Sequence, residues 1–139
     1  TYVVDRSLLE NSAGSDGLDI DFFNTRHATV DVRQSSAIGN GAEGFEVGTT
    51  SSTVVTLVLD DVVATNNGQD GIGDNAVSMF VARDVTASDN VGSGIRYSAA
   101  TNEGIEAQFV GVTAVGNGVF GIDLRDNTLG SLVASFTDV

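Results

Sequence analysis

The segment Asn40-Gly41-Ala42-Glu43-Gly44-Phe45-Glu46-Val47 decides the fold, because the chain repeats it. Related segments begin at Asn67, Asn90 and Asn117, and a looser copy runs from Ala13 to Ile20. The copies share one glycine, at Gly17, Gly44, Gly71, Gly94 and Gly121, so the spacings are 27, 27, 23 and 27 residues. Self-similarity at such a period is typical of repeat architectures.

When the copies are aligned on this glycine, each aligned position forms a column. Apolar residues occupy the same columns before the glycine in each copy, and they alternate with polar ones. The inward columns of the first expected strand hold Ala28, Val30, Val32; Val55, Leu57, Leu59; Ser78, Phe80, Ala82; and Ile105, Ala107, Phe109. Such alternation predicts a strand with one buried face. A two-residue turn such as Asp60-Asp61 leads to a second short strand, and a third begins at the glycine. Polar loops over 21–27, 48–53, 98–104 and 125–131 close the repeats.

Two architectures compete for this pattern. Asn-Gly between apolar runs is a hairpin signal, which favours an antiparallel sandwich. A sandwich, however, gives no reason for the same residue types to return every 27 residues. In a coil of short strands, each column stacks on itself about 4.8 Å further along the axis. We therefore predict a coil, in which Asn40, Asn67, Asn90 and Asn117 form a hydrogen-bonded ladder.

With its Asn-x-x-x-Gly-Ile segment, the chain resembles the right-handed parallel β-helix repeat family of pectate-lyase-like folds. The predicted fold is all-β: a right-handed parallel β-helix of about five coils of three short strands, forming one domain over residues 1–139. The right-handed sense follows from the resemblance and from the general preference of parallel crossovers.

Three stretches depart from the regular repeat. The first coil needs a one-residue insertion to bring Tyr2, Val4, Ser7 and Leu9 inward. The third places Asp74 in an inward column and has a shorter loop through Asn75, which predicts a local bulge or notch. Leu132, Ala134, Phe136 and Val139 begin a further coil. We therefore expect uncapped ends, either within a longer protein or stacked on other copies or flanking coils as a filament.

The composition limits the classes of partner. The net charge is −13, with six arginines, no lysine and 19 acidic residues, which disfavours nucleic acid as a partner. With no cysteine, the chain has neither disulfides nor thiolate metal ligands. Its longest apolar run is far too short for a membrane span.

Acidic residues stack in two outward columns, at one residue before the glycine and at two residues after it. The members predicted to bind metal are Asp16, Asp19, Glu43, Glu46 and Asp70. We call these two columns the acidic strip. Acids one coil apart repel by roughly 1 kcal/mol in water and more at lower dielectric. A cation would relieve this repulsion, so the strip could hold calcium, which prefers flexible carboxylate oxygens. The alternative, which we prefer, is a solvated acidic face. We expect Arg96 to neutralise Glu46 or Asp123.

The resemblance also implies chemistry on polyuronates. Only Asp60-Asp61 echoes the clustered aspartates of the hydrolase branch, and the basic part of a lyase site could come only from Arg6, Arg33, Arg83, Arg96 or Arg125. The sole histidine, His27, is expected in a surface loop. We assign no catalytic residue.

The sequence therefore favours a non-catalytic structural or interaction module of an extracellular or cell-surface protein, stacking end to end. The alternatives are part of a polysaccharide-active lyase, hydrolase or epimerase, and a carbohydrate-binding β-helix. An enzyme is expected to have a groove with acids and a basic residue near Asp74 and Asn75.

Overall fold

A computed structural model describes residues 1–23, 27–49, 54–75, 77–99, 105–126 and 132–139. These residues form an all-β structure without a helix. The strands are β1 (Tyr2–Asp5), β2 (Leu8–Glu10), β3 (Leu18–Phe22), β4 (His27–Ile38), β5 (Phe45–Thr49), β6 (Val54–Thr65), β7 (Ile72–Asn75), β8 (Met79–Ser88), β9 (Ile95–Ala99), β10 (Ile105–Val110), β11 (Ile122–Asp126) and β12 (Leu132–Thr137). No helix in this part of the chain could cross a membrane.

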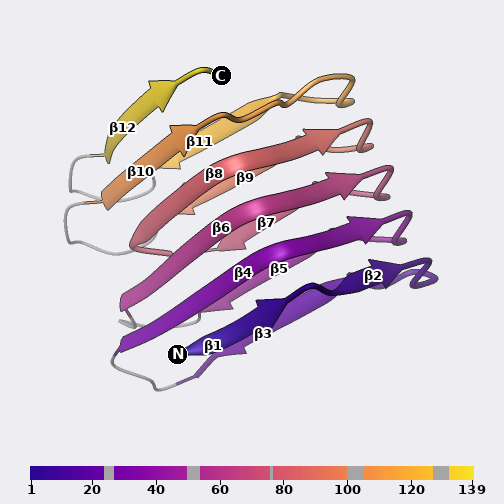
Figure 1. Cartoon of the computed structure of the whole chain (residues 1–139), viewed down its shortest axis with the longest axis horizontal. Helices are drawn as coiled ribbons and strands as arrows, with labels where there is room; N and C mark the ends of the chain where they lie inside the picture. Colours follow the sequence, from indigo (N-terminus) through magenta and orange to yellow (C-terminus); the bar gives the residue numbers. More distant parts are fainter. Residues whose placement is uncertain (24–26, 50–53, 76, 100–104, 127–131) are drawn as a thin grey trace.

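The strands stack in two parallel sheets that wind into a solenoid (Figure 1). One sheet has the order β1-β4-β6-β8-β10-β12, with β2 also on β4, and the other has the order β11-β9-β7-β5-β3. Val30, Leu57 and Phe80 are direct neighbours in parallel register. The predicted coil is therefore confirmed over the sandwich. The solenoid makes about four turns, slightly fewer than the five predicted coils.

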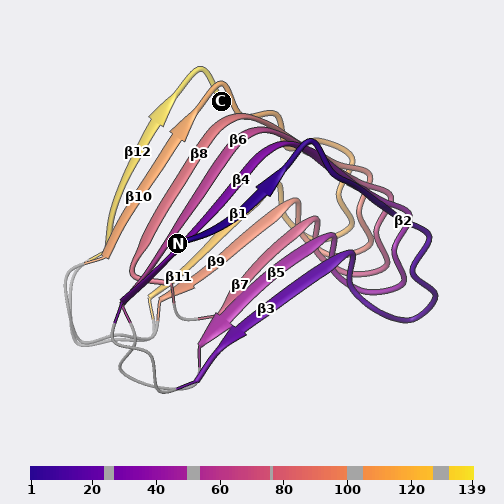
Figure 2. The ribbon, with the colours of Figure 1, turned by 60° about the horizontal axis from the view of Figure 1, so that its bottom comes forward.

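In the central turns, the first two of the three predicted strands follow each other without a break. They form one bent strand in β4 and in β6, both of which are 12 residues long. At the bend, Gln34, Asp61 and Asp84 adopt φ values of 46°, 55° and 50°. One left-handed residue per turn redirects the chain while the flanking residues keep their register. Figure 2 shows β4, β6 and β8 bending side by side.

The inward columns form one continuous apolar core between the two sheets. Its largest members include Phe80, whose ring centroid lies 5.5 Å from those of Tyr97 and Phe109. Phe109 stacks in turn on Phe136 at 5.0 Å. Burying a side chain of this size contributes about 1.5–3 kcal/mol, and the ring contacts add to it.

The predicted asparagine ladder is confirmed. Nδ2 of Asn67 donates to Oδ1 of Asn90 at 3.0 Å and to the backbone oxygen of Ala37 at 3.2 Å, and the same pattern joins Asn40 to Asn67 and Asn90 to Asn117. The ladder also explains the repeated glycine. A β-carbon at Gly44 would lie 2.7 Å from Nδ2 of Asn67 and 2.5 Å from the oxygen of Gly71, too close for any other residue.

The first and third coils depart from the repeat in different ways. Tyr2 pairs with Val30, as the one-residue insertion predicts. In the third coil, β7 keeps its register with β5 and β9 through Asn75, so no bulge interrupts the strand. Asp74 points inward and is 1% exposed, and its Oδ1 accepts a hydrogen bond from Val77 N at 2.9 Å. The predicted closing loops lie largely outside the described residues.

Candidate functional site: an acidic strip

The candidate site follows one edge of the five-stranded sheet. Asp16, Glu43 and Asp70 come just before the repeat glycines, at the start of β3, β5 and β7. The backbone N of each repeat glycine donates to the oxygen of the residue that precedes the glycine of the next coil, as Gly17 N does to Glu43 O at 3.0 Å. These bonds place the acids of this column directly over one another. The second column, two residues after each glycine, pairs Asp19 with Glu46 in parallel register. Both predicted columns therefore form.

Asp16, Glu43 and Glu46 are brought together in one cluster. One carboxylate oxygen from each residue lies within 4.8 Å of the other two. Oδ1 of Asp16 also accepts a hydrogen bond from Glu43 N at 2.9 Å, so this acid ties the first coil to the second. Asp19 is exposed beside the cluster. Three carboxylates at this spacing favour the uptake of a proton or a cation, because adjacent negative charges repel one another.

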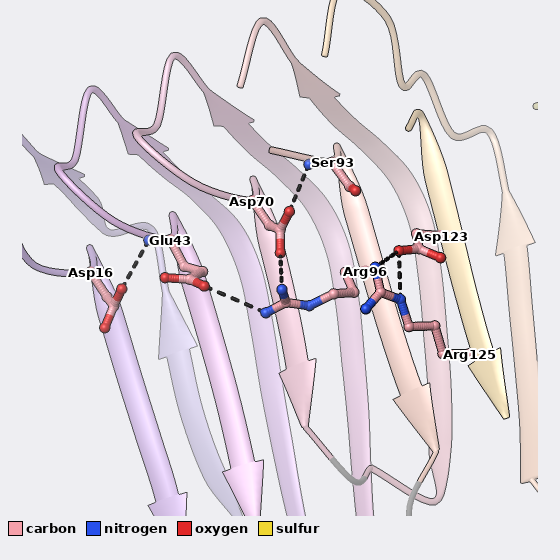
Figure 3. A network of polar contacts seen from close by, with 7 residues as sticks. All are labelled: Asp16, Glu43, Asp70, Ser93, Arg96, Asp123 and Arg125. Carbon is pink, nitrogen blue, oxygen red and sulfur yellow. Dashed lines mark hydrogen bonds and ion pairs between the residues drawn. The ribbon is translucent and has the colours of Figure 1, made fainter. Parts of the chain in front are cut away.

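Asp70 differs from the other predicted ligands, because Arg96 neutralises it. Nη1 of Arg96 lies 2.8 Å from Oδ2 of Asp70, and its Nη2 lies 3.5 Å from Oε1 of Glu43 (Figure 3). The Asp70 contact is an ion pair rather than an aligned hydrogen bond. Oδ1 of Asp70 accepts from Ser93 N at 2.6 Å. Asp70 therefore balances a cation that the chain itself supplies.

The partner predicted for Arg96 was wrong, and Gly73 explains why. Gly73 lies between Glu46 and Arg96 in the second column, and it has no side chain to occupy the surface there. The guanidinium can therefore reach across β7 to the first column. Asp123, the other predicted partner, instead pairs with Arg125, whose Nη2 lies 2.6 Å from Oδ2. A glycine within an outward column of charged residues was the sequence signal for this arrangement.

Burial and mutual repulsion raise the pKa values of the cluster. Burial is the main cause that raises the pKa of Glu43 to about 7, and a hydrogen bond with Asp16 and the charge of Glu46 act in the same direction. The pKa of Glu46 is raised by burial, then by Asp16, Asp19 and Asp21, and Arg96 opposes that shift. The pKa of Asp19 is also raised, by burial and then by Asp21 and Asp16. The cluster therefore holds a proton more readily than free carboxylates do.

The residues considered for catalysis lie elsewhere. Asp60 and Asp61 line a surface hollow of about 440 Å³ together with Val3, Asp5, Arg6, Arg33 and Gln34, at the bend of the seven-stranded sheet. The carboxylate of Asp74 is enclosed by the core, so it cannot face the groove that the enzyme interpretation predicted there. His27 is exposed at the first position of β4 rather than in a loop.

No protein-family model, curated protein or solved structure matches this chain. The parallel solenoid is consistent with a β-helix fold, and the narrower likeness to pectate-lyase-like repeats stays a resemblance.

Proposed function

We propose that this chain is a non-catalytic structural or interaction module, a stiff solenoid segment of an extracellular or cell-surface protein. The observation that carries the proposal is that the repeated polar side chains form hydrogen bonds between successive coils. Each ladder asparagine donates to the next one or to a backbone oxygen, and Asp16 and Asp70 accept from the backbone of the next coil. These side chains are engaged in holding coil to coil.

The proposed contact with other copies is end to end. At one end of the described stack, β12 pairs only with β10, and at the other, β1 and β2 pair only with β4. Phe136 on β12 stacks on Phe109 with one face and is still 51% exposed. A further coil from a second copy would pair with the strand edge and cover this ring, which is a heterologous contact and extends into a filament.

Negative-stain microscopy together with sedimentation velocity tests this proposal. Filaments or concentration-dependent elongation are expected, and Phe136→Asp is expected to abolish them. Val133→Asp is the matched control, because Val133 is on the same strand, is 61% exposed and alternates with Phe136 across the two faces. Particles of single-copy length at every concentration would contradict end-to-end assembly.

A second candidate function is binding or cleavage of an acidic polysaccharide. The specific observation in its favour is the surface hollow, whose lining contains both the acidic residues Asp60 and Asp61 and the basic residues Arg6 and Arg33. The test is release of reducing or unsaturated ends from polyuronate by the wild type and by Asp60→Asn and Asp61→Asn. Activity that these variants lose would place an enzyme ahead of the structural module.

A further inference from the structure

The bend of the seven-stranded sheet carries eight exposed polar residues that we call the charged ridge. Its members are Asp5, Arg6, Arg33, Gln34, Asp60, Asp61, Arg83 and Asp84, two from each of four successive turns. Figure 2 shows the bend at which the left-handed residues turn the chain, and six of the eight members of the ridge line the surface hollow described above.

The charges of the ridge alternate along the solenoid axis. Asp5 pairs in register with Arg33, Arg33 with Asp60, and Asp60 with Arg83. This first column therefore reads minus, plus, minus, plus. The second column, one residue later, reads Arg6, Gln34, Asp61 and Asp84.

The order minus, plus, minus, plus is complementary to the same column read in the opposite direction, because each negative charge then faces a positive one. Two ridges related by a two-fold axis along the strand direction face each other with opposite polarity, so Asp5 meets Arg83 of the other copy and Arg33 meets Asp60. The second column also matches its reverse, because Arg6 then meets Asp84 and the Gln34 amide meets Asp61. In a parallel arrangement, a two-fold axis along the solenoid places the first column opposite the second, so Asp60 meets Asp61 and Arg33 meets the uncharged Gln34, although Asp5 then meets Arg6 and Arg83 meets Asp84. The antiparallel contact opposes no like charges, so charge complementarity favours this orientation.

The charges needed for such a contact are largely available. In the part of the chain that the structure describes, Asp60, Asp61, Arg83 and Asp84 have no ion-pair partner. Nε of Arg6 lies 3.7 Å from Oδ2 of Asp5 and donates to Oε1 of Gln34 at 3.1 Å, and all three side chains are exposed. Arg33 does bind Asp31, but its side chain is 54% exposed, which leaves room for a second acid.

We propose that two copies of this chain associate side by side and antiparallel through the charged ridge. The contact is independent of end-to-end stacking, because it uses the bend rather than the strand edges. A ridge-to-ridge contact is narrow, so the dimer belongs to the small, transient class of interfaces and forms at high protein concentration. It is also expected to need some salt, because two copies that each carry −13 repel until that charge is screened.

Sedimentation equilibrium of two charge-reversal variants tests the proposal. In Arg83→Asp, residues 5 and 83 are both acidic, and in Asp5→Arg both are basic, so each variant opposes like charges twice in its own dimer. We expect each variant alone to dimerise about tenfold more weakly than the wild type. An equimolar mixture has every facing pair complementary and is expected to regain the wild-type dimer.

Net charge alone predicts a different result. Arg83→Asp changes the charge to −13 − 2 = −15, and Asp5→Arg changes it to −13 + 2 = −11, so general repulsion would make Asp5→Arg associate more strongly. Arg125→Asp is the control for Arg83→Asp, because it also gives −15 but lies on the other sheet, and it should leave the dimer nearly unchanged.

Disulfide trapping tests the relative orientation of the two copies in a separate experiment. It is feasible because the chain has no cysteine of its own. Gln34→Cys and Asp61→Cys, mixed and oxidised, are expected to form the mixed disulfide faster than either homodisulfide. Faster formation of the Gln34→Cys homodisulfide would indicate a parallel contact and overturn the proposal. Stronger self-association of Asp5→Arg than of the wild type, or a wild type that stays monomeric at millimolar concentration, would also overturn it.

Discussion

The guanidinium group of Arg96 lies over Gly73, with Nη2 3.5 Å from the point where a β-carbon on that glycine would stand. The same point is 3.1 Å from Cγ of Glu43, so a β-carbon at residue 73 would touch the guanidinium and would require the Glu43 side chain to shift. Gly73 thus provides the space in which Arg96 balances two acids that belong to different coils.

Replacing Arg96 by glutamine is expected to lower the free energy of unfolding by about 1–3 kcal/mol at pH 8. The reason is that Asp70 and Glu43, both buried, lose the cation that compensates them. Chemical denaturation measures the change. Arg125→Gln removes another ion-paired arginine, but Arg125 is 52% exposed, so its cost is expected to stay below about 1 kcal/mol. Equal costs for the two variants would contradict the bridging role of Arg96.

The protein is expected to be more stable near pH 5 than at pH 8. The folded pKa of Glu43 is raised from 4.5 to about 7, so between those values the folded state keeps a proton that the unfolded state has released. Stability therefore falls as the pH rises through this range. The raised pKa values of Glu46, Asp19 and the buried Asp74 act in the same direction.

The melting temperature measured from pH 5 to 8 checks this dependence. A fall equivalent to roughly 1–3 kcal/mol is expected across the range. Glu43→Gln cannot ionise, so its profile should be flatter and should lie above the wild type at pH 8. A wild-type stability that rises with pH would show that Glu43 is ionised in the folded protein throughout.

The repeat made the fold predictable, because a parallel solenoid places each residue on its own counterpart. The columns of Val30, Leu57 and Phe80 could be read directly from the spacing. The merging of two strands into β4 could not, since it depends on the φ angle of Gln34, a residue with no strong left-handed preference. Asp61 and Asp84 give a stronger signal at the same bend.

The candidate site was predictable to the level of columns and no further. The spacing correctly placed Asp16, Glu43 and Glu46 together. The partner of Arg96 depended on the direction in which a long side chain extends, and Gly73 on the neighbouring strand decided that direction. The inward position of Asp74 followed from its column, but the hydrogen bond that its carboxylate accepts from Val77 N did not.

Replacing Asn67 by alanine is expected to cost about 2–4 kcal/mol. The change removes the side-chain donor to the backbone oxygen of Ala37 and one of the two donors to Oδ1 of Asn90, which keeps the backbone N–H of residue 67. It also removes the oxygen that accepts from the backbone N and from Nδ2 of Asn40. The neighbouring Asn66 is exposed and left-handed, so Asn66→Gly serves as the control and is expected to change stability by less than about 0.5 kcal/mol. Denaturation of both variants in urea gives the comparison, and similar costs would contradict a ladder that bears stability.

Calcium binding by the acidic strip has a pH signature of its own. A cation and a proton compete for the oxygens of Asp16, Glu43 and Glu46, so millimolar calcium is expected to raise the melting temperature at pH 8 and to have little effect at pH 5. The proton released on binding can be measured by titration in buffers of different ionisation enthalpy.

Glu46→Gln removes one ligand that makes no ion pair in the described structure, and it should abolish the effect of calcium on the melting temperature. Asp123→Asn, which changes an acid of the same column already held by Arg125, should preserve it. A melting temperature that neither calcium nor chelator changes at pH 8 would leave the strip as a solvated acidic face that Arg96 partly neutralises.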